Sequence, residues 1–284
     1  MRSRLASAVV AGLVLAAAAA CGAVLPDDDE PLADDAGAAP PDAGLADGPT
    51  VDPAPEDGGH DSAYRAAVMA DDPVAYFRFE EAAGAGSAVD EAGLHLGTYH
   101  GGLVVPGFGG SARARQFAAG SGPVPVASLD GTDTLGFAGR SAMSVEVWLQ
   151  RSGAAQPETC VLSRYGPSAR APANAGGYRL MLGGATLRFE RERADNPFEL
   201  ATPPSMEVGA DAHHVVATFD GEHAVLYVDG GEVATADSDV ELAESDQPLL
   251  IGGCDAPFGG TIDEVAVYAY ALGPARVRAH YDAR

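Results

Sequence analysis

The chain has 284 residues, of which 46% are hydrophobic, and a formal net charge of −24 at pH 7. All 17 basic residues are arginines, and they face 41 acids. Such a balance excludes proteins that hold nucleic acid or anionic lipid by charge, because neither is attracted to an acidic surface.

The first twenty residues have the three parts of a secretory signal. Arg2 and Arg4 precede an apolar run that ends in small residues before Cys21. The run is too short and too rich in alanine for a permanent membrane span, so we expect residues 1–20 to be a signal peptide.

The junction Ala18–Gly22 resembles a bacterial lipobox, which implies that Cys21 is acylated. Acylation of Cys21 would hold an exported protein to a membrane. The lysine-free chain with its signal and acidic tether indicates a Gram-negative bacterium, and Gly22 after the cysteine fits sorting to the outer membrane, where the domain faces the periplasm or the cell surface. Ordinary cleavage beside an incidental cysteine is the alternative.

Residues 21–63 have a different character. They consist mainly of Asp, Ala, Pro and Gly, with twelve acids between Cys21 and Ser62 and no basic residue. A segment with so few apolar groups cannot compensate its ordering entropy, so we expect a disordered, self-repelling tether.

The two remaining cysteines, Cys160 and Cys254, form an even pair. In an exported protein they favour a disulfide, which closes a loop worth at most about 4–5 kcal/mol in the chain-entropy model. Two free thiols are the alternative.

Residues 64–284 read as one domain of many short strands separated by turns. Met143, Val145, Val147 and Leu149 alternate with Ser144, Glu146, Trp148 and Gln150, a period of two that is typical of a strand. Gly183-Gly184 indicates a hairpin, and the Asp220-Gly221 and Asp229-Gly230 turns predict a three-stranded meander over residues 213–236. This pattern favours an all-β fold.

Near the end, residues 260–268 read as a strand with one misplaced acid. Strict alternation puts Asp263 on the same face as Val265 and Val267, where a carboxylate needs a partner. A small helix is expected after Leu272-Gly273-Pro274.

These motifs carry a family resemblance. The opening Pro73–Glu81, the Leu226–Gly230 segment and the Gly260–Leu272 ending resemble laminin-G-like, concanavalin A-type domains. The resemblance implies an antiparallel two-sheet jelly-roll β-sandwich with a short C-terminal helix, in which the first and last strands lie side by side.

Such relatives often bind calcium where these strands meet. The resemblance therefore implies a structural Ca2+ held by Glu81, Asp90 and Asp263, whose oxygens are the ligands that calcium prefers. The alternative is that Asp263 caps local backbone donors and that Asp90 is an acid of a loop.

An enzyme is not expected. Retaining glycosidases need two carboxylates about 5 Å apart, and the strand around Glu146 offers a single acid. Glu190 and Glu192 alternate with arginines, which predicts an ion-paired edge. The less favoured alternative is a glycoside hydrolase.

Binding is the function that the resemblance implies, with a glycan or an envelope or extracellular protein as partner. Tyr99, Tyr165, Tyr178 and Phe258 are candidates to line a loop surface that stacks on sugar rings. The domain is expected to be monomeric, and a structural or adhesive protein-interaction module without sugar binding is the alternative.

Overall fold

The structure is a computed structural model that describes residues 59–284 except 109–112, 119, 153–157, 169–170, 194–195, 204–205, 244 and 255–256. The signal peptide, Cys21 and most of the tether lie outside the described residues. The described part belongs to one compact unit, Pro53–Arg284.

Two antiparallel sheets of eight strands each form the unit. Sheet A has the spatial order β14 (Gly231–Asp237), β13 (His223–Val228), β12 (His213–Phe219), β7 (Met143–Arg151), β16 (Gly260–Tyr268), β5 (Arg113–Phe117) and β4 (Leu103–Pro106), with β1 (Ala75–Phe77) also paired to β16. Sheet B has the order β11 (Asn196–Ala201), β10 (Thr186–Arg193), β9 (Ala171–Gly183), β8 (Thr159–Ser168), β15 (Leu249–Ile251), β6 (Val124–Ser128), β3 (His95–Thr98) and β2 (Ser87–Val89).

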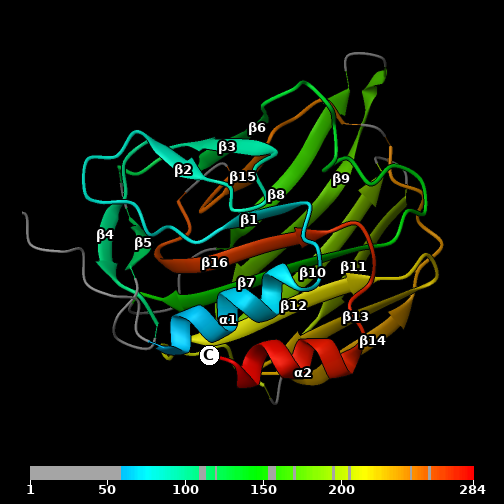
Figure 1. The fold of residues 1–284 in the computed structure, drawn as a ribbon. Helices are drawn as coiled ribbons and strands as arrows, with labels where there is room; N and C mark the ends of the chain where they lie inside the picture. The colour runs from blue at the N-terminus through cyan, green and yellow to red at the C-terminus, as the bar shows by residue number, and fades with distance from the viewer. Residues whose placement is uncertain are drawn as a thin grey trace, which may run out of the picture. The chain divides into compact units, whose positions relative to one another are not determined.

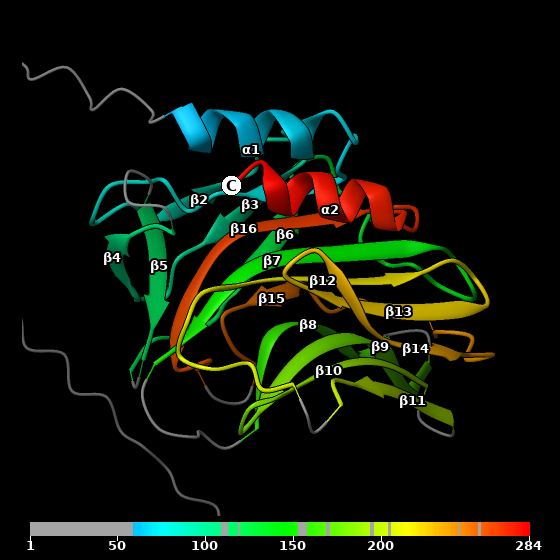
Figure 2. The same cartoon turned by 90° about the horizontal axis from the view of Figure 1, so that it is seen from below.

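The sheets pack face to face, and two helices cover the outer face of sheet A (Figures 1 and 2). These are α1 (Gly59–Met69) and α2 (Pro274–Asp282). The main core lies between the sheets and includes Val145, Leu180 and Phe189. A second core lies beneath the helices and contains Tyr64, Val68, Trp148 and Val277. This arrangement confirms the predicted jelly-roll β-sandwich with a short C-terminal helix.

The turn residues in the sequence predicted the positions of several strands correctly. The meander is β12, β13 and β14, and both turns use positive φ at Gly221, Asp229 and Gly230. In the β9–β10 hairpin, Gly183 still pairs with Thr186, so the turn falls one residue later than expected.

The first and last strands lie side by side, because β1 pairs with β16 from Ala75–Val267 to Phe77–Val265. The predicted face of Asp263 is wrong, however. Asp263 lies opposite Trp148, and the register of β16 against β7 shifts just after it. Glu264 is the extra residue, with a φ of 53°. This β-bulge reverses the alternation, so Asp263 faces the helices while Val265 and Val267 enter the main core.

Two further features concern the chain ends and the cysteines. Helix α1 was not predicted, and its Tyr64, the expected first residue of the domain, is fully buried. The expected disulfide is present: Cys160 of β8 is bonded to Cys254, just after β15, with Cα atoms 5.6 Å apart. It ties two neighbouring strands of sheet B together.

Candidate functional site

A groove of about 370 Å³ opens at one end of sheet B. Residues of β3, β6 and β8 line it, together with two loop segments that we call its rims. The first rim is residues 128–135 and the second is residues 245–248. The groove brings together segments that lie far apart in the sequence, so no local sequence motif predicts it.

Arg164 of β8 holds both rims in place. The residue is only 7% exposed. Its Nη2 donates to Asp133 Oδ2 of the first rim at 2.7 Å and to the Ser245 carbonyl of the second rim at 2.8 Å. One buried guanidinium therefore joins both loops across the groove.

His95 of β3 anchors the first rim from below. Its Nε2 lies 2.9 Å from Thr134 Oγ1, and its Nδ1 lies 3.1 Å from Asp90 Oδ2. Asp90 also accepts hydrogen bonds from neighbouring backbone N–H groups. Burial raises the pKa of Asp90, but the hydrogen bonds from His95 and the backbone outweigh burial, so its pKa lies below the ordinary value.

The groove mixes hydrogen-bonding groups with apolar walls. The polar groups are the side chains of Ser128, Thr132, Asp133, Asp246 and Gln247, and the apolar ones are those of Val126, Leu135 and Pro248. Such a lining suits a polyhydroxylated ligand that has both hydroxyl groups and apolar ring faces. Among the described lining residues, the guanidinium is that of Arg164, which is already paired with a carboxylate, so this lining does not favour an anion.

The four predicted aromatic residues do not converge on one surface. Tyr178 and Phe258 are buried in the main core, so the prediction that they line a loop surface is wrong. Tyr178 nevertheless supports the groove, because its hydroxyl donates to the carbonyl of Leu135 at 3.1 Å. The guanidinium of Arg179 lies over the ring of Tyr165 at 4.4 Å. Tyr99 is partly buried, and its hydroxyl donates to Glu81.

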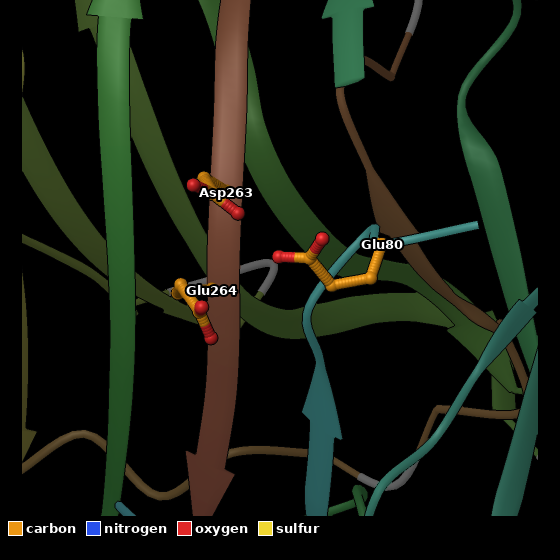
Figure 3. A group of neighbouring side chains, drawn as sticks. All are labelled: Glu80, Asp263 and Glu264. Carbon is orange, nitrogen blue, oxygen red and sulfur yellow. The ribbon is translucent and has the colours of Figure 1, made fainter. Parts of the chain in front are cut away.

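The acids predicted to bind calcium are not brought together either. Glu81 accepts from the Val89 N–H at 2.7 Å and from the Tyr99 hydroxyl at 2.5 Å, while Asp90 holds His95. Among the described residues, the group of acids that gathers around Asp263 consists of Glu80, Asp263 and Glu264, which we call the acid cluster. Figure 3 shows the Glu80 carboxylate directed toward β16, which carries the other two.

Arginines occupy the position where a cation would bind in this cluster. Arg284 Nη2 lies 2.7 Å from Asp263 Oδ2, and Arg78 Nε lies 3.3 Å from Glu264 Oε1. Calcium takes about 6–8 oxygen ligands. The guanidinium groups stand where further oxygens would have to approach, so these residues as arranged do not fit a calcium ion.

Sequence comparison agrees with this fold. The family model of the concanavalin A-like lectin/glucanases superfamily, Laminin_G_3, matches residues 124–278, more than half of the chain. The chain belongs to this superfamily. No curated protein matches the chain by sequence.

Several solved structures have a fold similar to that of this chain. The binding domain of Paraclostridial Mosquitocidal Protein 1 has a TM-score of 0.55 and 13% identity, over 73% of this chain and 51% of that one. The receptor binding domain of botulinum neurotoxin D has a TM-score of 0.57 and 14% identity, over 75% and 52%. The ligand binding domain of botulinum neurotoxin serotype D, solved with N-acetylneuraminic acid, has a TM-score of 0.57 and 13% identity, over 77% and 53%. The chain thus matches about half the length of each, and at such identity the likeness shows the fold alone.

The acid considered for glucanase chemistry in this superfamily, Glu146, is enclosed beneath the helices and fully buried. Its carboxylate accepts hydrogen bonds from the hydroxyls of Tyr64 and Tyr268, each at 2.7 Å. His214 Nε2 lies 2.8 Å and His280 Nδ1 3.0 Å from its oxygens. We call Glu146 with these four partners the Glu146 hub. It was not predicted from the sequence, because the partners come from four separate elements.

Burial and hydrogen bonding shift the pKa values of Glu146 and His280. Burial raises the pKa of Glu146, but the hydrogen bonds and charges of the two histidines outweigh it, so its pKa is lowered well below the ordinary range. Burial lowers the pKa of His280, but Glu146 and Asp71 raise it above 6.5.

Within the described residues, no helix is long and apolar enough to span a membrane.

The pKa shifts of the buried groups predict that the protein is most stable in mildly acidic solution, at about pH 5. Burial raises the folded-state pKa of Asp263 and Glu264, so stability falls as pH rises above their ordinary values. His280 stabilises the fold fully below pH 6.5 and loses this contribution above its raised pKa. The lowered pKa of Glu146 removes stability as pH falls below its ordinary value, 4.5.

Thermal unfolding followed by circular dichroism between about pH 4 and pH 9 measures this dependence. A melting temperature that climbs steadily from pH 5 to pH 9 would contradict the assignment of the buried carboxyls.

Proposed function

We propose that the domain is a non-catalytic binding module that takes a glycan in the groove of sheet B. The observation that carries the proposal is the rim construction: buried Arg164 and His95 fix two polar loops at a set spacing. A preformed groove limits the entropy that is lost on binding. The superfamily includes lectins, which is consistent with a sugar ligand.

The charge of the groove narrows the glycan class. Asp133 and Asp246 contribute carboxylates, and the guanidinium of Arg164 is shared between Asp133 and a backbone carbonyl. An added carboxylate on the ligand would meet repulsion from these acids, and the described lining offers no unshared guanidinium to compensate it. We therefore propose neutral glycans as ligands in preference to sialylated ones, although one structural neighbour was solved with N-acetylneuraminic acid.

The described acids support a non-catalytic role. Glu146 is buried and fully engaged, so a substrate in solvent does not reach it. Glu190 and Glu192 both bind Arg179, at 2.8 and 2.7 Å. Asp133 is held by Arg164. These three carboxylates are therefore already engaged by arginines.

The proposed location follows from the N-terminal sequence. We propose that acylated Cys21 anchors the protein to the outer membrane, and that the acidic segment up to residue 58 gives the domain reach. A ligand would then be a glycan of the envelope or of the cell's surroundings.

A protein partner is the second candidate, and a specific observation favours it. Large aliphatic side chains beside the groove are exposed: Val89 by 54%, Leu94 by 43%, Leu96 by 37% and Leu129 by 62%. Adjacent exposed apolar groups are typical of contact surfaces. In that case the module would be structural or adhesive and would bind no sugar.

A glycan array with the purified protein tests the proposal, in the presence of calcium and in the presence of EDTA. We expect saturable binding to neutral glycans, weaker binding to their sialylated counterparts, and no difference between the two buffers. A blank array together with specific capture of an envelope protein would overturn the glycan proposal and favour the second candidate. Cleavage of any bound glycan, seen by mass spectrometry, would overturn the non-catalytic role.

A further inference from the structure

An exposed row of aliphatic side chains begins at the wall of the groove. Val89 of β2 pairs with Leu96 of β3, and Leu96 pairs with Ala127 of β6, so the three side chains form a row across neighbouring strands (Figure 1). Ala127 also lines the groove. The row is therefore continuous with the proposed glycan site.

This row lies on the solvent side of sheet B. Ala88 and Val126, which precede Val89 and Ala127 along the chain, are buried in the main core. Alternation along each strand then places Val89, Leu96 and Ala127 on the outer face of the sheet. All three residues are exposed there.

Two further leucines extend the row toward the first rim. Leu94 and Leu129 follow the same alternation as Leu96 and Ala127 and therefore share their face. The Leu129 N–H donates to the Leu94 carbonyl at 3.0 Å, so the two segments are neighbours. We call the whole surface the aliphatic patch, and it consists of Val89, Leu94, Leu96, Ala127 and Leu129.

The aliphatic patch is uncharged, in a chain whose net charge is −24. The structure describes every residue of β2, β3 and β6, and the ionisable side chain among them is that of His95, which is buried. Asp130 lies next to Leu129, but its Oδ1 accepts from the Ser128 hydroxyl at 2.9 Å and from the Thr132 N–H at 2.8 Å. Such a surface suits an apolar group and offers no counter-charge to an ionic one.

Other occupants fit the patch less well. Glu81 Oε1 accepts from the Val89 N–H at 2.7 Å, which occupies a backbone donor that a partner strand would need at the edge strand β2. The segment before α1 carries twelve acids between Cys21 and Ser62. Those carboxylates would lose hydration on an apolar surface and gain no counter-charge.

We propose that the ligand of the groove is a glycan joined to an apolar aglycone, as in a neutral glycolipid. The inference rests on the proposed glycan function and names the ligand class of that site. The sugar occupies the groove beside Ser128 and Gln247, and the hydrocarbon chain leaves it over Ala127 and lies on the leucines of the aliphatic patch. Burial of its methylene groups there adds affinity that a free oligosaccharide lacks.

The experiment uses two probes made from the best neutral glycan of the array, its methyl glycoside and its octyl glycoside, the latter below its critical micelle concentration. Calorimetry measures the Kd of both for the wild type, Leu94→Ser/Leu96→Ser and Leu103→Ser. Leu94 and Leu96 belong to the patch and not to the groove lining. Leu103 is the matched control, because it is a leucine of β4 in sheet A that is 63% exposed.

We expect the wild type to bind the octyl glycoside at least about tenfold more tightly than the methyl glycoside, since burial of about two methylene groups is enough for this ratio. Leu94→Ser/Leu96→Ser should lose most of the preference and bind the methyl glycoside as the wild type does. Leu103→Ser should keep the preference. If the double variant does not fold, Val89→Ser takes its place, and we expect a reduced preference in it as well.

Three results would overturn the inference. Equal affinity of the wild type for the two glycosides would do so and leave the glycan proposal standing, and the aliphatic patch would then belong to the protein partner of the second candidate. A full preference for the octyl glycoside in a folded patch variant would show that the chain lies elsewhere. A blank array, or binding of neither glycoside, would overturn the glycan proposal itself and this inference with it.

Discussion

Replacing Glu146 with alanine is expected to lower the free energy of unfolding by about 3–5 kcal/mol, the usual effect of removing one partner from a buried ionic network. The substitution leaves the hydroxyls of Tyr64 and Tyr268 and the ring of His280 buried without their acceptor. These groups belong to α1, β16 and α2, so the loss should loosen both helices. Equilibrium unfolding in urea measures the change.

The control for this variant is Glu232→Ala, because Glu232 is an exposed glutamate on β14 of the same sheet. We expect it to change the unfolding free energy by no more than about 0.5 kcal/mol, as exposed substitutions do. A Glu146→Ala protein as stable as this control would show that the hub does not hold the helices.

Replacing Cys160 and Cys254 with serine should lower the free energy of unfolding by about 2–5 kcal/mol. The bond spans 94 residues of sequence, and its loss releases a long loop in the unfolded chain. It also ties β8, which carries Arg164, to the segment after β15. Urea unfolding of the double variant, compared with the wild type with and without reductant, gives the value.

Equal stability of all three samples would mean that the disulfide does not form or does not constrain the unfolded state. The wild type with reductant should resemble the double variant, and this agreement separates loss of the bond from any effect of the serines.

Much of the fold was readable from local chemistry. Aspartate-glycine pairs tolerate positive φ, so Asp229 and Gly230 marked a hairpin in advance. Alternation along β7 was predicted correctly because a strand buried on both sides still places Val145 and Glu146 on opposite faces. The pairing of β1 with β16 followed from the family resemblance.

The site was harder to predict, for identifiable reasons. The extra residue Glu264 reversed the alternation of β16, and no sequence signal marks a bulge whose positive-φ residue is a glutamate. Helix α1 buries mainly Tyr64 and Val68, a pair too sparse to reveal an amphipathic pattern just after an acidic segment. The groove depends on contacts between Arg164, Asp133 and the second rim, which lie far apart in the chain.

The most direct test of the central claim is the affinity of the best neutral glycan from the array, measured by calorimetry on the wild type and on groove variants. Asp133→Ala and Gln247→Ala should each weaken binding by about tenfold or more, the equivalent of one lost hydrogen bond to a charged or polar group. Glu232→Ala, far from the groove, should bind as the wild type does. Unchanged affinity in both groove variants would contradict the account, because the ligand would then bind elsewhere on the domain.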